Sequence, residues 1–217
     1  MKGKKVQKSI KRIFDIMVSL IILIPFFPIW FIIAILIKIT SPGPILFLQD
    51  RPGKCKNIFK VYKFRTMKPG SEKMVKGQEV MKDDDRITAV GRLLRRSKVD
   101  EIPQIINVLK GEMSLVGPRP ERVESLSDYT NEIAKRLNMR PGLTGLAQVS
   151  GNIYISLEER YKYDLYYVRN FSLWLDIKII LRTVGVVLLG EDRYVDKSLI
   201  DISEVQINST SEKRFVK

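Results

Sequence analysis

A long apolar segment near the N-terminus dominates the hydropathy pattern. No charged residue occurs between Ile16 and Ile37, and most positions there are Ile, Leu, Val or Phe. As a straight helix, these roughly 22 residues would reach about 33 Å, which is enough to cross a bilayer. Lysines and arginines stand on both sides of the segment, so the positive-inside rule assigns neither end to the outside.

Two prolines, Pro25 and Pro28, interrupt this segment. Each lacks a backbone N–H donor, and its ring clashes with the preceding turn, so we expect a bend there. A helix that enters the membrane, breaks and returns to the same side would satisfy both the bend and the matching flanks. A single kinked span is the alternative, and the residues alone favour neither.

Beyond the turn at Ser41–Pro44, the pattern predicts an α+β domain that is mainly helical. Ile45–Gln49 and Ile58–Arg65 are short and rich in Ile, Phe, Val and Tyr, which is typical of strands. The polar stretch Lys68–Asp85 predicts a loop. Its acidic run Asp83–Asp85 favours a solvated, self-repelling segment over a metal site.

Five further segments are predicted to be helical. They are Ile87–Arg96, Ile102–Lys110, Glu121–Asn138, Leu157–Val168 and Leu173–Leu189. In the second of them apolar residues recur at i, i+3, i+4 and i+7, and Gly111 follows as a stop signal.

The last of these segments is apolar but carries charged residues. Asp176, Lys178 and Arg182 argue against a second membrane crossing. Its apolar side chains nevertheless fall on one helical face, so a helix lying in the membrane surface and a buried core helix both stay open. That face consists of Trp174, Ile177, Leu181, Val184 and Leu188.

Composition narrows the chemistry. The 217 residues carry a formal net charge of +14, which suits nucleic acid, acidic lipid or phosphorylated substrates. The absence of histidine excludes Ser-His-Asp and Cys-His catalysis and every His-based zinc site. Cys55 is the single cysteine, so no internal disulfide forms. Neither usual glycine-rich nucleotide loop is present. An enzyme acting near neutral pH would therefore use carboxylates, lysines, arginines or an added metal.

An acidic pair offers such chemistry. Asp100 and Glu101 precede Pro103, a residue tolerated in the first turn of a helix, so both acids are expected at a helix N-terminus. The positive end of the helix dipole would keep Asp100 ionised. Most acids in such a place are only caps. The pair gains weight from positive residues that could offset pyrophosphate charge, namely Lys63, Arg65, Arg95, Arg96 and Arg119.

A set of short motifs resembles a known family. They are Lys63–Met67, Asp100–Gln104, Asn107–Gly111, Met113–Ser114, Gly117–Pro120 and Arg140–Val149. In this order and spacing they resemble the bacterial sugar transferases, which are monotopic polyprenyl-phosphate phosphoglycosyl transferases. The resemblance runs from about Lys11 to about Thr183 and is closest to the small, minimal form.

The resemblance implies an architecture and a location. It implies a re-entrant membrane helix broken at Pro28, with both ends and the catalytic domain on the cytoplasmic side of the bacterial inner membrane. Phe27 stands where many relatives have serine, and Pro25 is an additional proline. The expected parts are a basic lead-in and membrane helix in 1–40, a catalytic domain with interfacial helices in 41–190, and a polar tail in 191–217.

The resemblance also implies an activity, the Mg²⁺-dependent transfer of a sugar phosphate from a UDP-sugar to undecaprenyl phosphate with release of UMP. Asp100 would be the nucleophile that forms an aspartyl-phosphosugar intermediate. Glu101 would be its acid/base partner or, with Asp100, a Mg²⁺ ligand. Phosphate-binding residues would be Lys63, Arg95 and Arg119. Arg140 would contact the nucleotide, and Asp176 is a further candidate metal ligand.

Two other classes of function compete with this one. A membrane-anchored nucleic-acid-binding module would need basic residues segregated with aromatics on one face, whereas here they are spread along the chain, so no nucleic-acid partner is expected. A scaffold without chemistry is the third. The sugar and the pathway cannot be read from these motifs, and a homodimer stays open.

Overall fold

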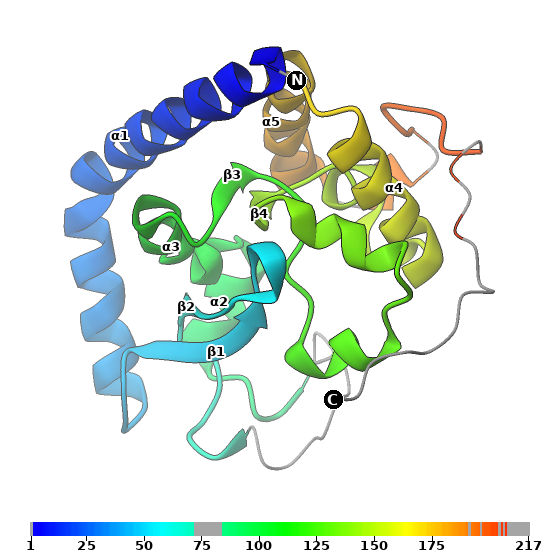
Figure 1. Ribbon diagram of the computed structural model, residues 1–217. Coiled ribbons are helices and arrows are strands. Elements are labelled where there is room, and N and C mark those ends of the chain that lie inside the picture. The colour runs from blue at the N-terminus through cyan, green and yellow to red at the C-terminus, as the bar shows by residue number, and fades with distance from the viewer. Residues whose placement is uncertain are drawn as a thin grey trace.

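The computed structural model describes residues 2–71, 84–190, 192–195, 197–203, 205 and 207, with side chains from Val6 onward. Asp83, part of the acidic run, lies outside these residues. The described chain is mainly helical and contains two two-stranded sheets (Figure 1). This confirms the predicted mainly helical fold with a small sheet.

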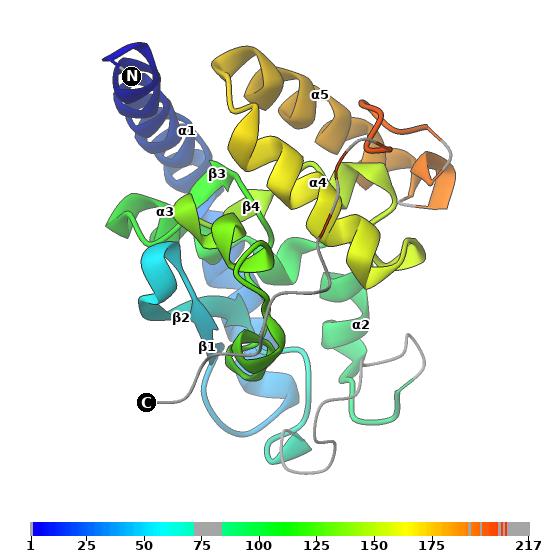
Figure 2. The same ribbon diagram turned by 45° about the vertical axis from the view of Figure 1, so that its right-hand side comes forward.

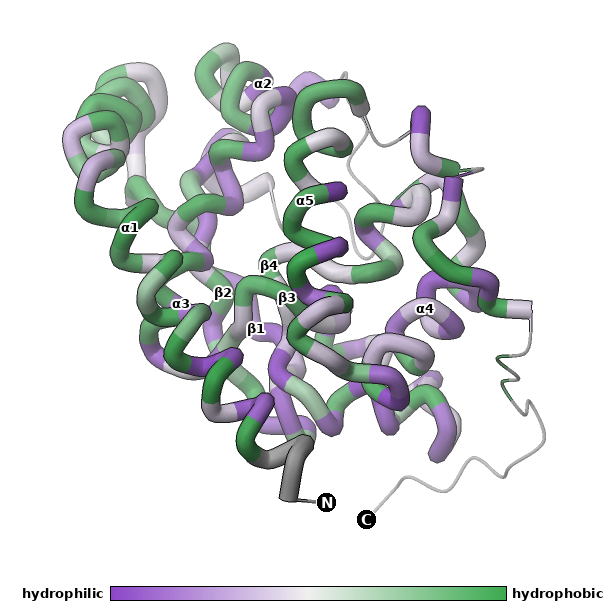
Figure 3. Tube along the Cα trace, turned by 90° about the horizontal axis from the view of Figure 1, so that it is seen from above, coloured by the Kyte–Doolittle hydropathy of each residue, from purple (hydrophilic) through white to green (hydrophobic). Residues whose placement is uncertain are grey.

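One long helix, α1 (Lys2–Thr40), begins the chain and includes the basic lead-in. Pro25 and Pro28 lie inside it, and its axis changes direction part-way along, as predicted (Figure 1). By length and composition, Val6–Thr40 could cross a membrane. Viewed from above, most of the helix is hydrophobic (Figure 3).

The predicted hairpin is present as β1 (Leu46–Pro52) and β2 (Ile58–Phe64), which pair antiparallel with Leu46 opposite Phe64. The first strand is longer than predicted, because Pro52 is at its end, where a missing N–H costs no ladder bond. The turn η1 (Lys54–Lys56) joins the strands.

A second pair of strands joins two sequence motifs that we did not predict as strands. β3 (Ser114–Val116) runs parallel to β4 (Gly142–Thr144). A Cβ on Gly142 would stand 2.1 Å from the backbone nitrogen of Gly117, so the two backbones approach as closely as only glycine allows.

Four helices follow near their predicted positions: α2 (Ala89–Arg96), α3 (Gln104–Lys110), α4 (Leu157–Arg169) and α5 (Leu173–Leu189). Local capping explains three of the starts, and at α5 the Ser172 side chain accepts the Leu175 N–H. The Thr88 side chain accepts the Gly91 N–H at α2, and Ser156 forms a reciprocal capping box with Glu159 at α4.

The prediction of a single helix over Glu121–Asn138 is wrong. The segment instead forms two 3₁₀ stretches, η4 (Val123–Asp128) and η5 (Ile133–Asn138). The sequence from the end of η4 onward, Asp128-Tyr129-Thr130-Asn131, is poor in helix formers, and Asp, Thr and Asn side chains compete for backbone hydrogen bonds. Tyr129 itself turns inward and is 5% exposed.

The main core lies around β3, β4 and α5, where Val108, Met113, Leu146 and Ile179 are fully buried. α5 contributes one face to this core. The opposite face, which the sequence singled out as apolar, is exposed, with Trp174 at 64%, Leu181 at 68% and Leu188 at 75%. The alternative of a helix buried in the core is therefore excluded for that face.

Candidate functional site

Two segments bring positive charge to Glu101. The Lys63 Nζ atom at the end of β2 lies 2.7 Å from Glu101 Oε1, and Arg119 Nη2 donates to the same oxygen at 3.1 Å. Glu101 itself is in the 3₁₀ turn η3 (Val99–Glu101). Although burial alone would raise the pKa of Glu101, the charges of Arg119 and Lys63 lower it well below its usual range. Glu101 is therefore a fixed carboxylate at neutral pH.

The pKa of Asp100 is shifted in the opposite direction from that of Glu101. Partial burial and the neighbouring charge of Glu101 raise its pKa, while Lys63, Arg95 and Lys98 oppose this rise. Burial opposes the expected stabilisation of ionised Asp100 by a helix dipole. Asp100 precedes α3 in the short turn η3, and burial dominates there.

Arg95 approaches Asp100 from α2. Its Nε atom donates to Thr66 Oγ1 at 2.9 Å, and its charge lowers the pKa of Asp100. The structure thus gathers four of the predicted residues with Asp100: Lys63 and Arg119 contact Glu101, and Arg95 lies near Asp100 itself. The two acids and three cations could receive and hold a pyrophosphate.

Three other predicted residues make contacts elsewhere. Arg140 Nε donates to the carbonyl of Gly111 at 2.7 Å, where α3 ends. Asp176 accepts hydrogen bonds from Lys11 Nζ and from the Tyr167 hydroxyl, both at 2.7 Å, so its carboxylate joins α1 to α4 and α5. Arg65 is buried and donates to the Ser41 and Pro42 carbonyls, which fixes the turn after α1.

Sequence reasoning missed the residues that hold Arg119 in place. Arg51 Nη1 donates to the Pro120 carbonyl at 3.2 Å. From the other side, Arg136 Nη2 donates to the Arg119 carbonyl at 2.8 Å. Arg136 is fully buried and forms an ion pair with Asp164. In the sequence it stands in a polar segment that favours a solvated side chain, so no local signal identifies it.

Asn107 is a second such residue. It is completely buried, its Oδ1 accepts the Tyr62 N–H at 3.1 Å, and its Nδ2 donates to the Lys60 carbonyl at 2.7 Å. These bonds tie α3 to β2, the strand that carries Lys63. The Asn107–Gly111 motif contains this residue, so the sequence marks the position. Its role in joining α3 to β2 is visible only in the folded structure.

The donor set for a metal is small. Among the described residues no group of three or more Asp, Glu, Cys or His side chains comes together. The adjacent pair Asp100 and Glu101 nevertheless fits Mg²⁺, because this ion is commonly held by one or two carboxylates plus substrate phosphates. Asp84, from the acidic run, is instead ion-paired with Arg86.

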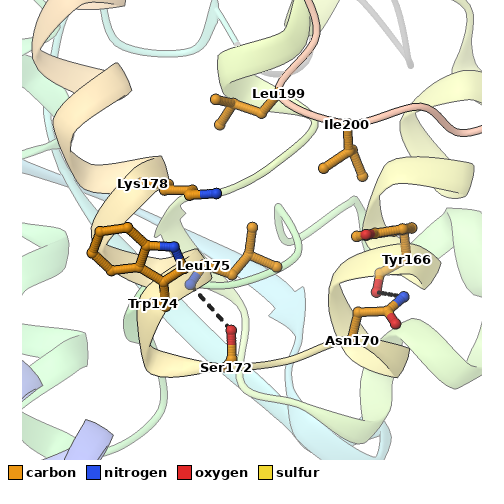
Figure 4. Close-up of a pocket in the computed structure, with 8 residues that line it drawn as sticks. All are labelled: Tyr166, Asn170, Ser172, Trp174, Leu175, Lys178, Leu199 and Ile200. Atoms are coloured by element: carbon orange, nitrogen blue, oxygen red, sulfur yellow. Dashed lines mark hydrogen bonds between the residues drawn. The ribbon is translucent and has the colours of Figure 1, made fainter.

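A pocket elsewhere on the described chain contains none of these residues. It lies at the junction of α4 and α5, with Trp174 and Lys178 on one side and Tyr166 and Asn170 on the other (Figure 4). Ser172 and Leu175 form its base, and Leu199 and Ile200 complete the lining. The candidate site at η3 is separate from this pocket.

Comparison with known proteins identifies the family. A model of the family described as bacterial sugar transferase matches residues 6–190. A UDP-N-acetylgalactosamine-undecaprenyl-phosphate N-acetylgalactosaminephosphotransferase of Aeromonas hydrophila is 42% identical over 188 residues, which are 83% of this chain and 44% of that protein.

Two further relatives are similar over greater shares of their own length. The uncharacterized sugar transferase EpsL of Bacillus subtilis is 41% identical over 84% of this chain and 89% of its own length. A UDP-glucose:undecaprenyl-phosphate glucose-1-phosphate transferase of Caulobacter vibrioides is 41% identical over 85% of this chain and 72% of its own. The chain thus spans less than half of the Aeromonas relative and most of the other two. The family match and these identities show that the chain belongs to the bacterial sugar transferase family.

Proposed function

We propose that the protein transfers a sugar 1-phosphate from a UDP-sugar to undecaprenyl phosphate, giving a polyprenyl-diphosphate sugar and UMP. Relatives at about 40% identity carry names for reactions of this type. The observation that carries the proposal is the paired arrangement at η3. Asp100 is a partly buried acid of raised pKa, and it stands beside a Glu101 carboxylate fixed by Lys63 and Arg119.

The reaction would proceed in two displacements at one phosphorus atom. An Asp100 carboxylate oxygen attacks the phosphorus that bears the sugar, and the bond to UMP breaks, with its electron pair leaving on UMP. A phosphate oxygen of the lipid then attacks the same phosphorus and releases Asp100 as a carboxylate. Covalent catalysis divides one difficult transfer into two easier ones, and a carboxylate nucleophile needs no histidine.

Each charged residue has a part in this scheme. Lys63, Arg95 and Arg119 bind the diphosphate and offset the charge that develops on its oxygens. Glu101 keeps Lys63 and Arg119 in position, and its lowered pKa makes it a weak base but a suitable metal ligand. Mg²⁺, held by Asp100 and Glu101, would neutralise phosphate charge.

The packing of α1 supports a re-entrant course in the membrane. Near its start, Lys11 pairs with Asp176, and Asp15 accepts from Ser114 Oγ at 2.8 Å. Near its end, Ile33 and Ile37 are buried in one cluster with Phe64 and Leu94. Both arms of the bent helix therefore contact the same domain, which a helix crossing the bilayer could not do. We infer that the domain faces the cytoplasm, where UDP-sugars would reach Asp100.

The test is a screen for UMP release with purified protein, undecaprenyl phosphate, Mg²⁺ and a panel of UDP-sugars. Wild-type protein should release UMP with at least one sugar, and Asp100→Asn should lose at least about a thousandfold of that rate, because the nucleophile is gone. Lys54→Gln, in the exposed turn η1, is the matched control and should keep the wild-type rate. Full activity in Asp100→Asn would contradict the mechanism.

A further inference from the structure

The outward face of α2 combines two cations with an exposed apolar side chain. Leu93 is 68% exposed, whereas its neighbour Leu94 is 4% exposed. Arg92 and Arg96 flank Leu93 and are also exposed. Within the part of the chain that the structure describes, neither guanidinium group has a hydrogen-bond or ion-pair partner. We call Arg92, Leu93 and Arg96 the α2 face.

This face continues the surface of the membrane helix. Leu94, on the inner side of α2, packs in one cluster with Ile33 and Ile37 from the second arm of α1. On the same arm, Ile32 is 56% exposed and Ile39 is 77% exposed. Basic residues around an exposed leucine, next to an exposed apolar helix, are suited to an anionic membrane surface. The α2 face is therefore placed where lipid headgroups would lie.

The same short helix also reaches the candidate site. Arg95 lies between the residues of the α2 face in sequence, but its Nε atom points inward to Thr66 Oγ1 and its charge acts on Asp100. A phosphate bound by Arg92 and Arg96 would lie within one helical turn of the residue that approaches the nucleophile. Arg95 thus connects the helix that carries the α2 face to Asp100.

We propose that the α2 face is the docking site from which the phosphate of the lipid acceptor passes to Asp100 for the transfer step, with Arg92 and Arg96 on the docked phosphate and Leu93 against the isoprenoid chain. This inference rests on the proposed function. Arginine binds phosphate through paired N–H donors, and an acceptor with one anionic end and a long apolar chain matches the charge and apolar character of the face. A UDP-sugar has no apolar chain for Leu93 to contact.

The experiment separates the two halves of the reaction. Wild-type protein, Arg92→Gln/Arg96→Gln and the control Lys54→Gln/Lys56→Gln are assayed in neutral-detergent micelles. The control removes the same charge from η1, which lies on the other side of the molecule from α2 (Figure 2). Adduct formation on Asp100 is measured by mass spectrometry without lipid. Sugar-phosphate transfer is then measured against undecaprenyl phosphate concentration.

We expect the α2 double variant to form the adduct like wild type and to show a KM for undecaprenyl phosphate raised about 25-fold. The basis is roughly fivefold for each interfacial arginine. Leu93→Gln should raise the KM for undecaprenyl phosphate as well, whereas Leu93→Met, which keeps an apolar side chain, should keep the wild-type KM. The control should keep both values. An unchanged KM in the double variant, with the adduct intact, would overturn the inference alone.

Two other outcomes are distinguishable. In the first, the α2 double variant transfers sugar phosphate normally in micelles and more slowly than wild type only in anionic phospholipid vesicles. This result would overturn the assignment to the acceptor, because the arginines would then bind bulk lipid headgroups. Failure of the wild-type protein to form an adduct or release UMP would contradict the proposed function, and this inference with it.

Discussion

Asp100 and Glu101 are adjacent acids whose environments push their pKa values apart. Burial dominates at Asp100 and raises its pKa, whereas Lys63 and Arg119 lower the pKa of Glu101. Such divergence is typical of carboxylates with different chemical roles. In this account Asp100 must be ionised to attack phosphorus, so the rate of UMP release should rise with pH through a pKa above that of an ordinary aspartate.

Substitutions near Asp100 should shift this acidic limb in opposite directions. Glu101→Gln removes a negative charge that raises the pKa of Asp100, so the limb should move to lower pH even though the maximal rate falls. Lys98→Met removes a positive charge that lowers this pKa, so the limb should move to higher pH. The measurement is the pH dependence of UMP release in a single turnover. Shifts of the same sign in both variants would contradict this assignment.

At the scale of elements, a buried ion pair joins α1 to α5. Lys11 and Asp176 have side chains only 8% and 7% exposed, and Tyr167 from α4 donates to the same carboxylate. The charge of Lys11 on α1 thus has a structural role in fixing this helix to the domain. Breaking a buried pair from one side leaves an uncompensated charge, which is more costly than removing both.

We therefore predict that Lys11→Met lowers the free energy of unfolding in detergent by about 3–5 kcal/mol. The double variant Lys11→Met/Asp176→Asn should recover most of this loss, because the amide oxygen still accepts from Tyr167 and carries no charge. Thermal unfolding of the purified variants is the measurement. A change below about 1 kcal/mol in Lys11→Met, as for an exposed pair, would show that this contact does not fix α1.

Local patterns in the sequence predicted most elements, and contacts distant in sequence account for the rest. Apolar and charged patterns located α2 to α5, with the clearest periodicity and a glycine stop signal at α3, and the prolines indicated the bend in α1. The parallel pairing of β3 with β4 was not predictable, because three-residue strands have no period and their partner is 28 residues away in register. Likewise the motifs singled out Lys63, Glu101 and Arg119 as candidate site residues, whereas Arg51 and Arg136 act through backbone carbonyls that only the fold brings near.

At the scale of the whole molecule, the formal charge of +14 and the exposed apolar faces of α1 and α5 describe a protein suited to an anionic membrane surface. The two arms of α1 return to one domain, so both ends of the helix should be on one side of the membrane. The single cysteine, Cys55, is exposed in the described structure and provides a reporter for the domain.

Thiol labelling of intact spheroplasts tests this topology. A membrane-impermeant maleimide should leave Cys55 unlabelled until the membrane is permeabilised. A Lys8→Cys/Cys55→Ser variant, with the thiol before the apolar segment, should behave in the same way. Labelling of the Lys8→Cys position in intact spheroplasts would show a spanning helix and contradict the re-entrant course.

The covalent intermediate on Asp100 is the central claim, and mass spectrometry of the intact protein tests it most directly. Incubation with a UDP-sugar substrate and Mg²⁺, without lipid and followed by a rapid acid quench, should add the mass of one sugar phosphate. Peptide mapping should place this mass on Asp100. Asp100→Asn should stay unmodified while remaining folded and more heat-stable at neutral pH, because the raised pKa means that ionised Asp100 opposes folding above that pKa. An active wild-type protein that never carries the added mass, or carries it on another residue, would contradict the account.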